Sequence, residues 1–289
     1  MAGTLFVVAT PIGNLEDLSF RALRVLKEVD LIAAEDTRRT LKLLSHYGIR
    51  QSMVSLHEHN EVRETPRLIA RLASGASIAL VSDAGTPGIA DPGAHLVHAA
   101  REAGIVVSPI PGPSSVMAAL SASGVPASEF VFMGFPPRSG SDRSKWFARL
   151  AAESRPVVFF EAPHRIARTV DEARQLLAER PIHIHRELTK IHEEYAVYHN
   201  HAAGSPPKPT GEFVAIVAPR NETGRVVSDN AAKLEQAVAM IGCMTDKCSI
   251  DSDAAIPVIA RGFDVSASAL RKAIKKARIA DKRRDESLS

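Results

Sequence analysis

The chain has 289 residues, of which 45% are hydrophobic, 24% are charged and 5% are aromatic, and its formal net charge at pH 7 is only +3. This length allows two compact domains and a small further unit, and so balanced a charge does not select one class of ligand. No run of about 18 apolar residues occurs and no signal-peptide pattern opens the chain, so we expect a cytoplasmic protein without a membrane partner.

The first part of the chain alternates short apolar runs with amphipathic helical patterns. The runs typical of buried strands are 5–9, 31–34, 78–81 and 106–110. Thr37 is placed to cap one of the helices, and Asp91 followed by Pro92 is typical of another helix start. Strands and helices that alternate at this spacing predict a mainly parallel sheet with helices on both faces.

A second α/β unit is predicted from residue 114 onwards. It comprises a helix over 114–121, strands at 130–133 and 157–160, a helix near 166–177, and strands near Ile182, Tyr195 and Phe213. Short connections join the last three strands, so we expect this part of the sheet to be partly antiparallel. The predicted α/β domains are therefore residues 1–113 and 114–220.

A polar segment after residue 220 marks a linker to a small C-terminal unit, residues 221–289. Two short helices are predicted there, over 251–260 and 266–280, and the second has an apolar face. Between Ala269 and Arg284 this unit has eight basic residues and one acidic residue. Such a patch suits phosphate groups, so Arg271 and Lys275 are candidates for phosphate contact, although a solvated charged face explains them equally well.

Turn-rich segments follow the carboxyl ends of the predicted strands. They are residues 10–14, 35–38, 82–88 and 111–115. Ligands of open α/β sheets bind at this edge, near the point where strand order reverses. The G-x-G-x-x-G signature is absent, which argues against a dinucleotide dehydrogenase and against the usual Rossmann-type methyltransferase. The loops leave room for another nucleotide-like ligand.

Residues that commonly bind metals are few. Cys243 and Cys248 can form neither a disulfide framework nor a four-ligand zinc site, and we interpret them as reduced thiols. The segment 57–60 (HEHN) and the pair His183 and His185 lack further ligands at suitable spacing. We therefore predict no metal site, and we assign HEHN to an ordinary structural role, to the shape of a cleft, or to RNA contact.

Eight motifs resemble those of one protein family. They are TPIGNLEDLS, AEDTRRT, HEHN, VSDAGTPGIADPG, PGPSS, MGFPPR, EAPHR and RELTK, in this order. Together they are similar to the tetrapyrrole methylase superfamily (class III methyltransferases), and within it to the branch that methylates a ribose 2′-hydroxyl of a cytidine in the decoding region of 16S rRNA. The resemblance implies two α/β domains with S-adenosyl-L-methionine in the cleft between them, a small C-terminal helical unit, and a homodimer whose partner is 16S rRNA in the small ribosomal subunit.

The same resemblance places the methyl donor against loops of both domains, largely through backbone groups. The implied donor contacts are Pro11, Ser82, Asp83, Ala84, Gly85, Ile89, Ala90, Ser114, Ser115, Phe160, Glu161, Leu188, Gly211 and Glu212. The chain departs from the family pattern in the proline-rich loop before Gly211 and in the tail after about Asp229. These departures affect the expected RNA contacts more than the expected binding of the methyl donor.

A sulfonium is a good leaving group, so the main tasks of such an enzyme are positioning and the exclusion of water. A ribose hydroxyl reacts faster when a general base takes its proton. Acids and bases in the matched loops give four catalytic candidates, namely Glu35, Asp36, Lys190 and Glu194. Helix capping explains the first two equally well and a solvated charged face explains the others, so the base stays open.

Further basic residues of the matched loops are candidates for phosphate contact. They are Arg38, Arg138, Arg143, Lys145 and Arg165. Trp146 has the helical spacing of a buried residue relative to Leu150, so we predict that it packs in the core rather than on a base. Two other functions stay open, a methylase of a small tetrapyrrole-like molecule and a noncatalytic RNA-binding assembly protein.

Overall fold

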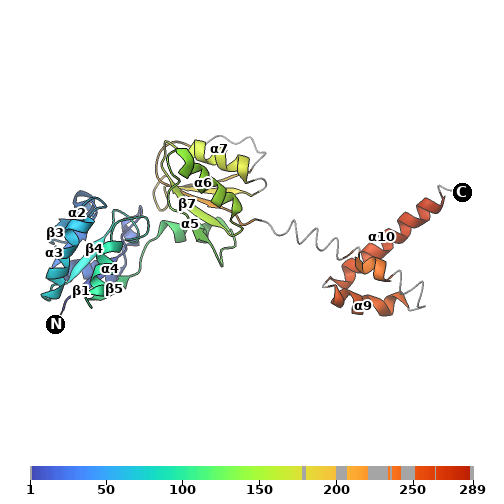
Figure 1. Ribbon diagram of the computed structural model, residues 1–289, viewed down its shortest axis with the longest axis horizontal. Helices are drawn as coiled ribbons and strands as arrows, with labels where there is room; N and C mark the ends of the chain where they lie inside the picture. Colours follow the sequence, from blue (N-terminus) through green and yellow to red (C-terminus); the bar gives the residue numbers. More distant parts are fainter. Residues whose placement is uncertain are drawn as a thin grey trace. The chain divides into compact units, whose positions relative to one another are not determined.

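The computed structural model describes residues 2–177, 180–199, 207–220, 234, 236–241, 251–263 and 265–286 (Figure 1). By its internal contacts the chain divides into two compact units, Met1–Arg220 and Asn221–Ser289. The first unit holds two five-stranded sheets, as expected for a chain with two α/β domains. Within the described ranges, no helix is both long enough and apolar enough to cross a membrane.

The first sheet is parallel throughout and has the strand order β3-β2-β4-β1-β5. Its strands are β1 (Thr4–Val8), β2 (Leu31–Ala34), β3 (Met53–Ser55), β4 (Ile78–Val81) and β5 (Val106–Ile110). The predicted parallel sheet is therefore confirmed. The sequence pattern missed β3, because its three half-buried residues show no alternation of apolar and polar side chains.

Helices cover both faces of this sheet. They are α1 (Phe20–Glu28), α2 (Thr37–His46), α3 (Glu61–Ala73) and α4 (Ala94–Glu102), with a short 3-10 helix η1 (Leu15–Asp17) before α1. Ile32 and Ala34 pack with α1 and α2. Leu31 and Ala33 point to the opposite face and pack with α3 and α4. The alternation of side chains along β2 thus produces two apolar layers.

Two predicted helix starts differ from the structure. Asp36, and not Thr37, caps α2, because its carboxylate accepts the N–H of Arg38 at 2.8 Å. The α4 helix begins at Ala94, three residues after Asp91. Asp91 is therefore not its cap.

The cap of α4 comes from α3. Oε1 of Glu61 accepts the N–H groups of Gly93, His95 and Leu96 at 3.0–3.2 Å. A carboxylate next to the free N–H groups of a helix start satisfies donors that have no partner within the helix. Glu61 thereby fixes the end of the loop that carries Asp91.

The second sheet has the order β6-β7-β10-β8-β9. Its strands are β6 (Val131–Phe132), β7 (Val157–Glu161), β8 (Ile182–Arg186), β9 (Glu194–Tyr198) and β10 (Phe213–Val217). Only β6 and β7 are parallel; the three later strands pair antiparallel. The expected antiparallel part is therefore confirmed.

Helix α5 (Ser115–Ser123) covers one face of this sheet, and α6 (Gly140–Ala152) and α7 (Ile166–Leu176) cover the other, where Figure 1 shows them beside β7. Trp146 is only 6% exposed, which confirms its predicted burial. Ile12, which follows β1, belongs to the apolar cluster under α5. A loop of the first sheet is thus anchored in the core of the second.

The C-terminal unit has a small apolar core of its own. The predicted helices are present as α9 (Ser252–Gly262) and α10 (Ala267–Glu286), and Leu270 of α10 packs with Ile256 and Ile259 of α9. Arg271 and Lys275 are exposed on α10. The predicted linker after residue 220, the two cysteines, the side chains beyond Ala277 and residues 201–206 of the proline-rich loop lie outside the described part of the chain.

Candidate active site

The order of the first sheet creates a crevice between β1 and β4. The helix after β1, α1, packs on one face of the sheet and the helix after β4, α4, packs on the opposite face, so the loops at the carboxyl ends of these neighbouring strands lead to opposite faces. The loops stay joined at their start, because Thr10 and Gly85 exchange two backbone hydrogen bonds of 2.9 and 3.0 Å. This is the edge at which the sequence predicts a ligand.

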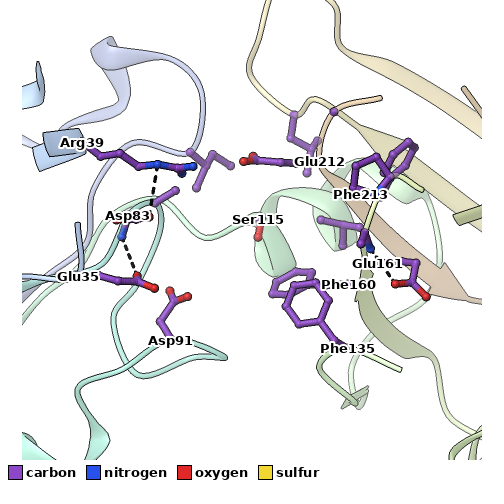
Figure 2. Close-up of a pocket in the computed structure, with 17 residues that line it drawn as sticks. Glu35, Arg39, Asp83, Asp91, Ser115, Phe135, Phe160, Glu161, Glu212 and Phe213 are labelled. Atoms are coloured by element: carbon purple, nitrogen blue, oxygen red, sulfur yellow. Dashed lines mark hydrogen bonds and ion pairs between the residues drawn. The ribbon is translucent and has the colours of Figure 1, made fainter. Parts of the chain in front are cut away.

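A cavity of about 350 Å³ opens at this edge (Figure 2). Its walls come from both sheets of the first unit. The lining residues are Ile12, Glu35, Arg39, Asp83, Ala84, Asp91, Ser115, Phe135, Phe160, Glu161, Ala162, Pro163, Leu188, Gly211, Glu212, Phe213 and Val214. Figure 2 shows the carboxyl groups of Glu35, Asp83 and Asp91 on one side and the rings of Phe135 and Phe160 on the other. The space therefore has an acidic wall with Glu35, Asp83 and Asp91 and, opposite it, an aromatic wall on whose side Glu161 and Glu212 also lie.

Most of the residues with an implied donor contact lie at this cavity or beside it. Asp83, Ala84, Ser115, Phe160, Glu161, Leu188, Gly211 and Glu212 line it. Pro11 and Ser82 line an adjoining cavity of about 190 Å³, which shares Arg39 and Asp83 with the first. Gly85, Ile89, Ala90 and Ser114 belong to the same loops but line neither cavity.

Two loops of the acidic wall hold one another through their carboxylates. Oε2 of Glu35 accepts the N–H of Asp83 at 3.1 Å, and Oδ1 of Asp83 accepts the N–H of Asp36 at 3.0 Å. Nε of Arg39 lies 3.4 Å from Oδ2 of Asp83. The ends of β2 and β4 are therefore fixed at the cavity, and Asp83 is neutralised there by a cation.

Asp91 also belongs to this wall, although its sequence pattern predicts only a helix start. Burial raises its pKa to about 6, the negative charges of Glu35 and Asp83 act in the same direction, and a hydrogen bond with Ser82 opposes them. Burial also raises the pKa of Glu35. The wall thus holds two carboxyl groups that bind a proton more tightly than an exposed carboxyl group does. The signal was the position of Asp91 within a matched motif, which the helix-start pattern of Asp91-Pro92 obscured.

Of the four catalytic candidates, only Glu35 lines the cavity. Both carboxylate oxygens of Asp36 accept from Arg38, at 3.0 and 2.7 Å, and this pairing holds the pKa of Asp36 well below its usual range. Glu194 pairs with Lys208 at 3.0 Å and Arg186 at 3.2 Å, which also lowers its pKa. These two carboxylates are committed to cations outside the cavity.

Lys190 lies at the rim of the cavity. Its Nζ lies 2.8 Å from Glu187 and 3.0 Å from Glu212, and Glu212 lines the cavity. Glu187 and Thr189 have φ angles of 55° and 66°, which are uncommon for residues other than glycine. Leu188 lies between them and lines the cavity, so this turn holds strained backbone at the site.

Gly13, in the loop after β1, lies in close contact with the turn around Leu188. A Cβ on Gly13 would lie 2.7 Å from the carbonyl oxygen of Leu188 and 2.5 Å from Cγ of Lys190. The loop after β1 and the turn after β8 are therefore in direct contact, and only glycine allows so close an approach.

Glu161 is buried next to Phe160 in β7, and protein groups occupy both of its carboxylate oxygens. Oε1 accepts from the N–H of Ala162 at 2.7 Å and pairs with Arg165 at 2.5 Å, whereas Oε2 accepts from the hydroxyl of Thr169 at 2.6 Å. Its side chain therefore has no accessible oxygen for a ligand, and Glu161 contributes the shape of the wall.

The prediction that Arg143 contacts RNA is wrong, because its side chain is buried. It is only 4% exposed, and its guanidinium donates to Thr169 at 2.9 Å, to the carbonyl oxygen of Pro137 at 2.9 Å and to Glu172 at 2.9 Å. Arg165 donates in the same way to the carbonyl oxygen of Pro136 at 3.1 Å. Arg143 is thus an internal residue, and the two arginines hold the loop next to Phe135.

The other basic residues predicted to contact RNA are exposed. They are Arg38, Arg138, Lys145, Arg271 and Lys275. In the described part of the chain, no group of three or more histidine, cysteine or carboxylate side chains is arranged to hold a metal ion.

The family model for Tetrapyrrole (Corrin/Porphyrin) Methylases matches residues 4–200, which include both sheets up to β9 and most of the cavity. The chain belongs to the tetrapyrrole methylase family. A member from Pseudomonas aeruginosa, called ribosomal RNA small subunit methyltransferase I, is 47% identical over 75% of this chain and 79% of its own length. A protein of the same name from Haemophilus influenzae is 40% identical over 92% of this chain and 95% of its own length. The match to the latter spans 274 residues and so extends into the C-terminal unit.

Solved structures give the same fold for the tetrapyrrole methylase part of the chain. The crystal structure of the methyltransferase CobJ superposes with a TM-score of 0.58, at 18% identity, over 75% of this chain and 95% of that protein. At this level of identity the likeness concerns the fold alone.

Proposed function

We propose that this methyltransferase moves a methyl group from S-adenosyl-L-methionine to the ribose 2′-hydroxyl of a cytidine in the decoding region of 16S rRNA. The class of enzyme and of acceptor follows from relatives that share 40–51% identity and the name ribosomal RNA small subunit methyltransferase I. The donor, the nucleotide and the methylated atom are part of the proposal.

The cavity supports a donor of this chemistry. S-adenosyl-L-methionine has a sulfonium and an ammonium group against one carboxylate, so it has a net positive charge that an acidic wall attracts. Phe135 and Phe160 offer ring faces to an adenine base; their own centroids lie 5.3 Å apart. Five carboxylates and one arginine line the cavity, a balance that disfavours a phosphate group inside it.

Methyl transfer requires one bond to form and one to break. The ribose O2′ attacks the methyl carbon, the carbon–sulfur bond breaks, and its electron pair stays on the sulfur. The hydroxyl proton leaves to a base, which the acidic wall supplies. The residues of this chain would position the two reactants and exclude water; the anchored loops after β1, β4 and β8 favour such preorganisation.

RNA phosphates would lie outside the cavity, on the exposed cations Arg38, Arg138 and Lys145 of the first unit and, separately, on Arg271 and Lys275 of the C-terminal unit. Because a folded RNA target is complete only in the particle, we propose the small ribosomal subunit in the cytoplasm as the acceptor and a homodimer as the active form.

The test compares three acceptors with labelled donor: small subunits that lack the modification, a short oligonucleotide of the same sequence, and a mixture of tetrapyrrole precursors. We expect strong labelling of subunits and weak labelling of the oligonucleotide. Labelling of the tetrapyrroles alone would replace the proposed acceptor by a small molecule. Donor binding without any labelling would favour a noncatalytic assembly protein.

A further inference from the structure

The five carboxylates of the cavity fall into two groups by their partners. Asp83 lies 3.4 Å from Arg39, Glu161 lies 2.5 Å from Arg165, and Glu212 lies 3.0 Å from Lys190. Each of these three carboxylates is therefore already engaged in an ion pair.

The other two are Glu35 and Asp91. Within the described residues, neither forms an ion pair with a lysine or an arginine. Glu35 has one oxygen occupied by the N–H of Asp83. Asp91 has only a neutral group nearby, the hydroxyl of Ser82, which lowers the pKa of Asp91 and itself donates to the carbonyl oxygen of Ala84 at 3.3 Å. Figure 2 shows the carboxyl group of Asp91 at the cavity, below that of Glu35. Asp91 is therefore the least committed carboxylate of the cavity.

The loop that carries Asp91 is held at both ends. Gly85 is paired to Thr10 at the start of the loop, and Glu61 binds the N–H of Gly93 two residues after Asp91. Ala90, directly before Asp91, has a φ of 63°, an uncommon angle that the fixed ends maintain. These constraints hold Asp91 in the lining of the cavity.

We infer that Asp91 is the general base of methyl transfer and that Glu35 acts on it as a positioning residue. This inference rests on the proposed function, because it needs a hydroxyl acceptor. As the oxygen–carbon bond forms, the hydroxyl proton passes to the Asp91 carboxylate, and it then leaves to solvent when the products separate. The nearby negative charge of Glu35 increases the proton affinity of Asp91, which a base needs in order to accept a proton in the transition state.

The pH dependence of kcat follows from the groups that face Asp91. They are Glu35 at the end of β2, Asp83 and Ser82 after β4, and Arg39 of α2, which pairs with Asp83. A base must be ionised to act. The logarithm of kcat should therefore rise with pH at low pH, bend near the pKa of about 6 and stay level above it.

The first variant is Asp91→Asn, measured with labelled donor and small ribosomal subunits. We expect kcat at pH 7.5 to fall by about 100-fold or more, the range for loss of a general base. The donor dissociation constant, measured by calorimetry, should change far less. Asp91→Glu keeps a carboxyl group and should retain part of the activity together with an acidic limb. Glu102→Gln removes one exposed carboxylate from α4 and is the matched control.

The second variant, Glu35→Gln, separates a positioning role from a purely structural one. Loss of the Glu35 charge lowers the proton affinity of Asp91, so the bend in the pH profile should move to lower pH. An unmoved bend would contradict this role of Glu35.

Two outcomes overturn the assignment of Asp91 itself. One is an Asp91→Asn variant whose kcat equals that of the wild type. The other is an Asp91→Asn variant with a reduced kcat whose pH profile still rises at low pH and bends at the same pH as the wild type. If the wild-type protein bound no donor and labelled no subunit, the proposed function would fail as well. Wild-type labelling with full activity of Asp91→Asn would overturn the inference alone.

Discussion

Thr169 is the residue on which the buried charges of the second sheet depend. Its hydroxyl donates to Glu161 at 2.6 Å and accepts from Arg143 at 2.9 Å, and the residue is fully buried. Through this one hydroxyl, the carboxylate of Glu161 is joined to the arginine that holds the carbonyl oxygen of Pro137. Buried charged groups are costly when they lose a partner.

Replacement of Thr169 by valine tests this dependence. Valine has nearly the same volume and no hydroxyl, so Glu161 and Arg143 each lose a hydrogen bond. We expect the free energy of unfolding to fall by about 1–3 kcal/mol. Trp146, the only tryptophan of the chain, packs on Phe159 with ring centroids 5.2 Å apart, so its fluorescence reports urea unfolding of this region.

Thr169→Ser is the matched control, because it keeps the hydroxyl and loses one methyl group. Its stability should lie between that of the wild type and that of Thr169→Val. Equal stability of the serine and valine variants would show that the hydroxyl contributes nothing to the network.

The sequence identified some site residues and misread others for identifiable reasons. Glu35 was selected because it follows a strand, where ligands of parallel sheets bind, and it does line the cavity. Arg143 was misread, although residues 143, 146, 147 and 150 share one helical face and three of them are apolar; that spacing indicates burial. Asp91 was misread because the group that caps α4, Glu61, lies far from it in sequence, and no local pattern shows such a contact.

Among the helices, Glu61 of α3 caps the start of α4 and thereby holds the end of the loop that carries Asp91. Glu61→Ala removes the acceptor of three N–H groups, and the loss of a helix cap costs about 1 kcal/mol. We expect the midpoint of urea unfolding, followed by circular dichroism, to fall accordingly. The freed loop should also lower kcat.

Glu61→Gln serves as its control, since the amide keeps one oxygen that can accept from the same N–H groups. It should recover most of the stability. A Glu61→Ala variant as stable and as active as the wild type would show that the cap does not hold the loop.

Periodicity and strand spacing predicted most elements of both sheets, because buried parallel strands are continuous apolar runs and their helices are amphipathic. They did not predict β3, which is three residues long, or the contact of Gly13 with the turn around Leu188. Both depend on residues far apart in the sequence. The cavity is formed by contacts between residues far apart in the sequence. The motifs therefore indicated many of its lining residues but not their arrangement in space.

At the scale of the whole molecule, charge is divided between the units. The cavity of the first unit is acidic, whereas the described part of α10 exposes Arg271, Lys272, Lys275 and Lys276. This division suits a cationic donor at one place and RNA phosphates at another.

The double variant Arg271→Gln/Lys275→Gln tests the RNA contact of α10. Each lost phosphate contact should reduce the slope of log affinity against log salt by about one, so we expect a change of about two for binding to small subunits. Donor affinity should stay the same. The matched control is Lys27→Gln/Arg101→Gln, which removes two exposed charges from α1 and α4. If both double variants changed the salt slope equally, the change would reflect the overall charge of the protein and not a specific RNA contact of α10.

Mapping the methylated product shows directly which nucleotide and which atom this protein modifies. Small subunits labelled by this protein would be digested to nucleosides, and the modified nucleoside and its position in 16S rRNA would be determined by mass spectrometry. We expect a single 2′-O-methylcytidine in the decoding region. A methyl group on a base, or on a nucleotide elsewhere in the subunit, would contradict it.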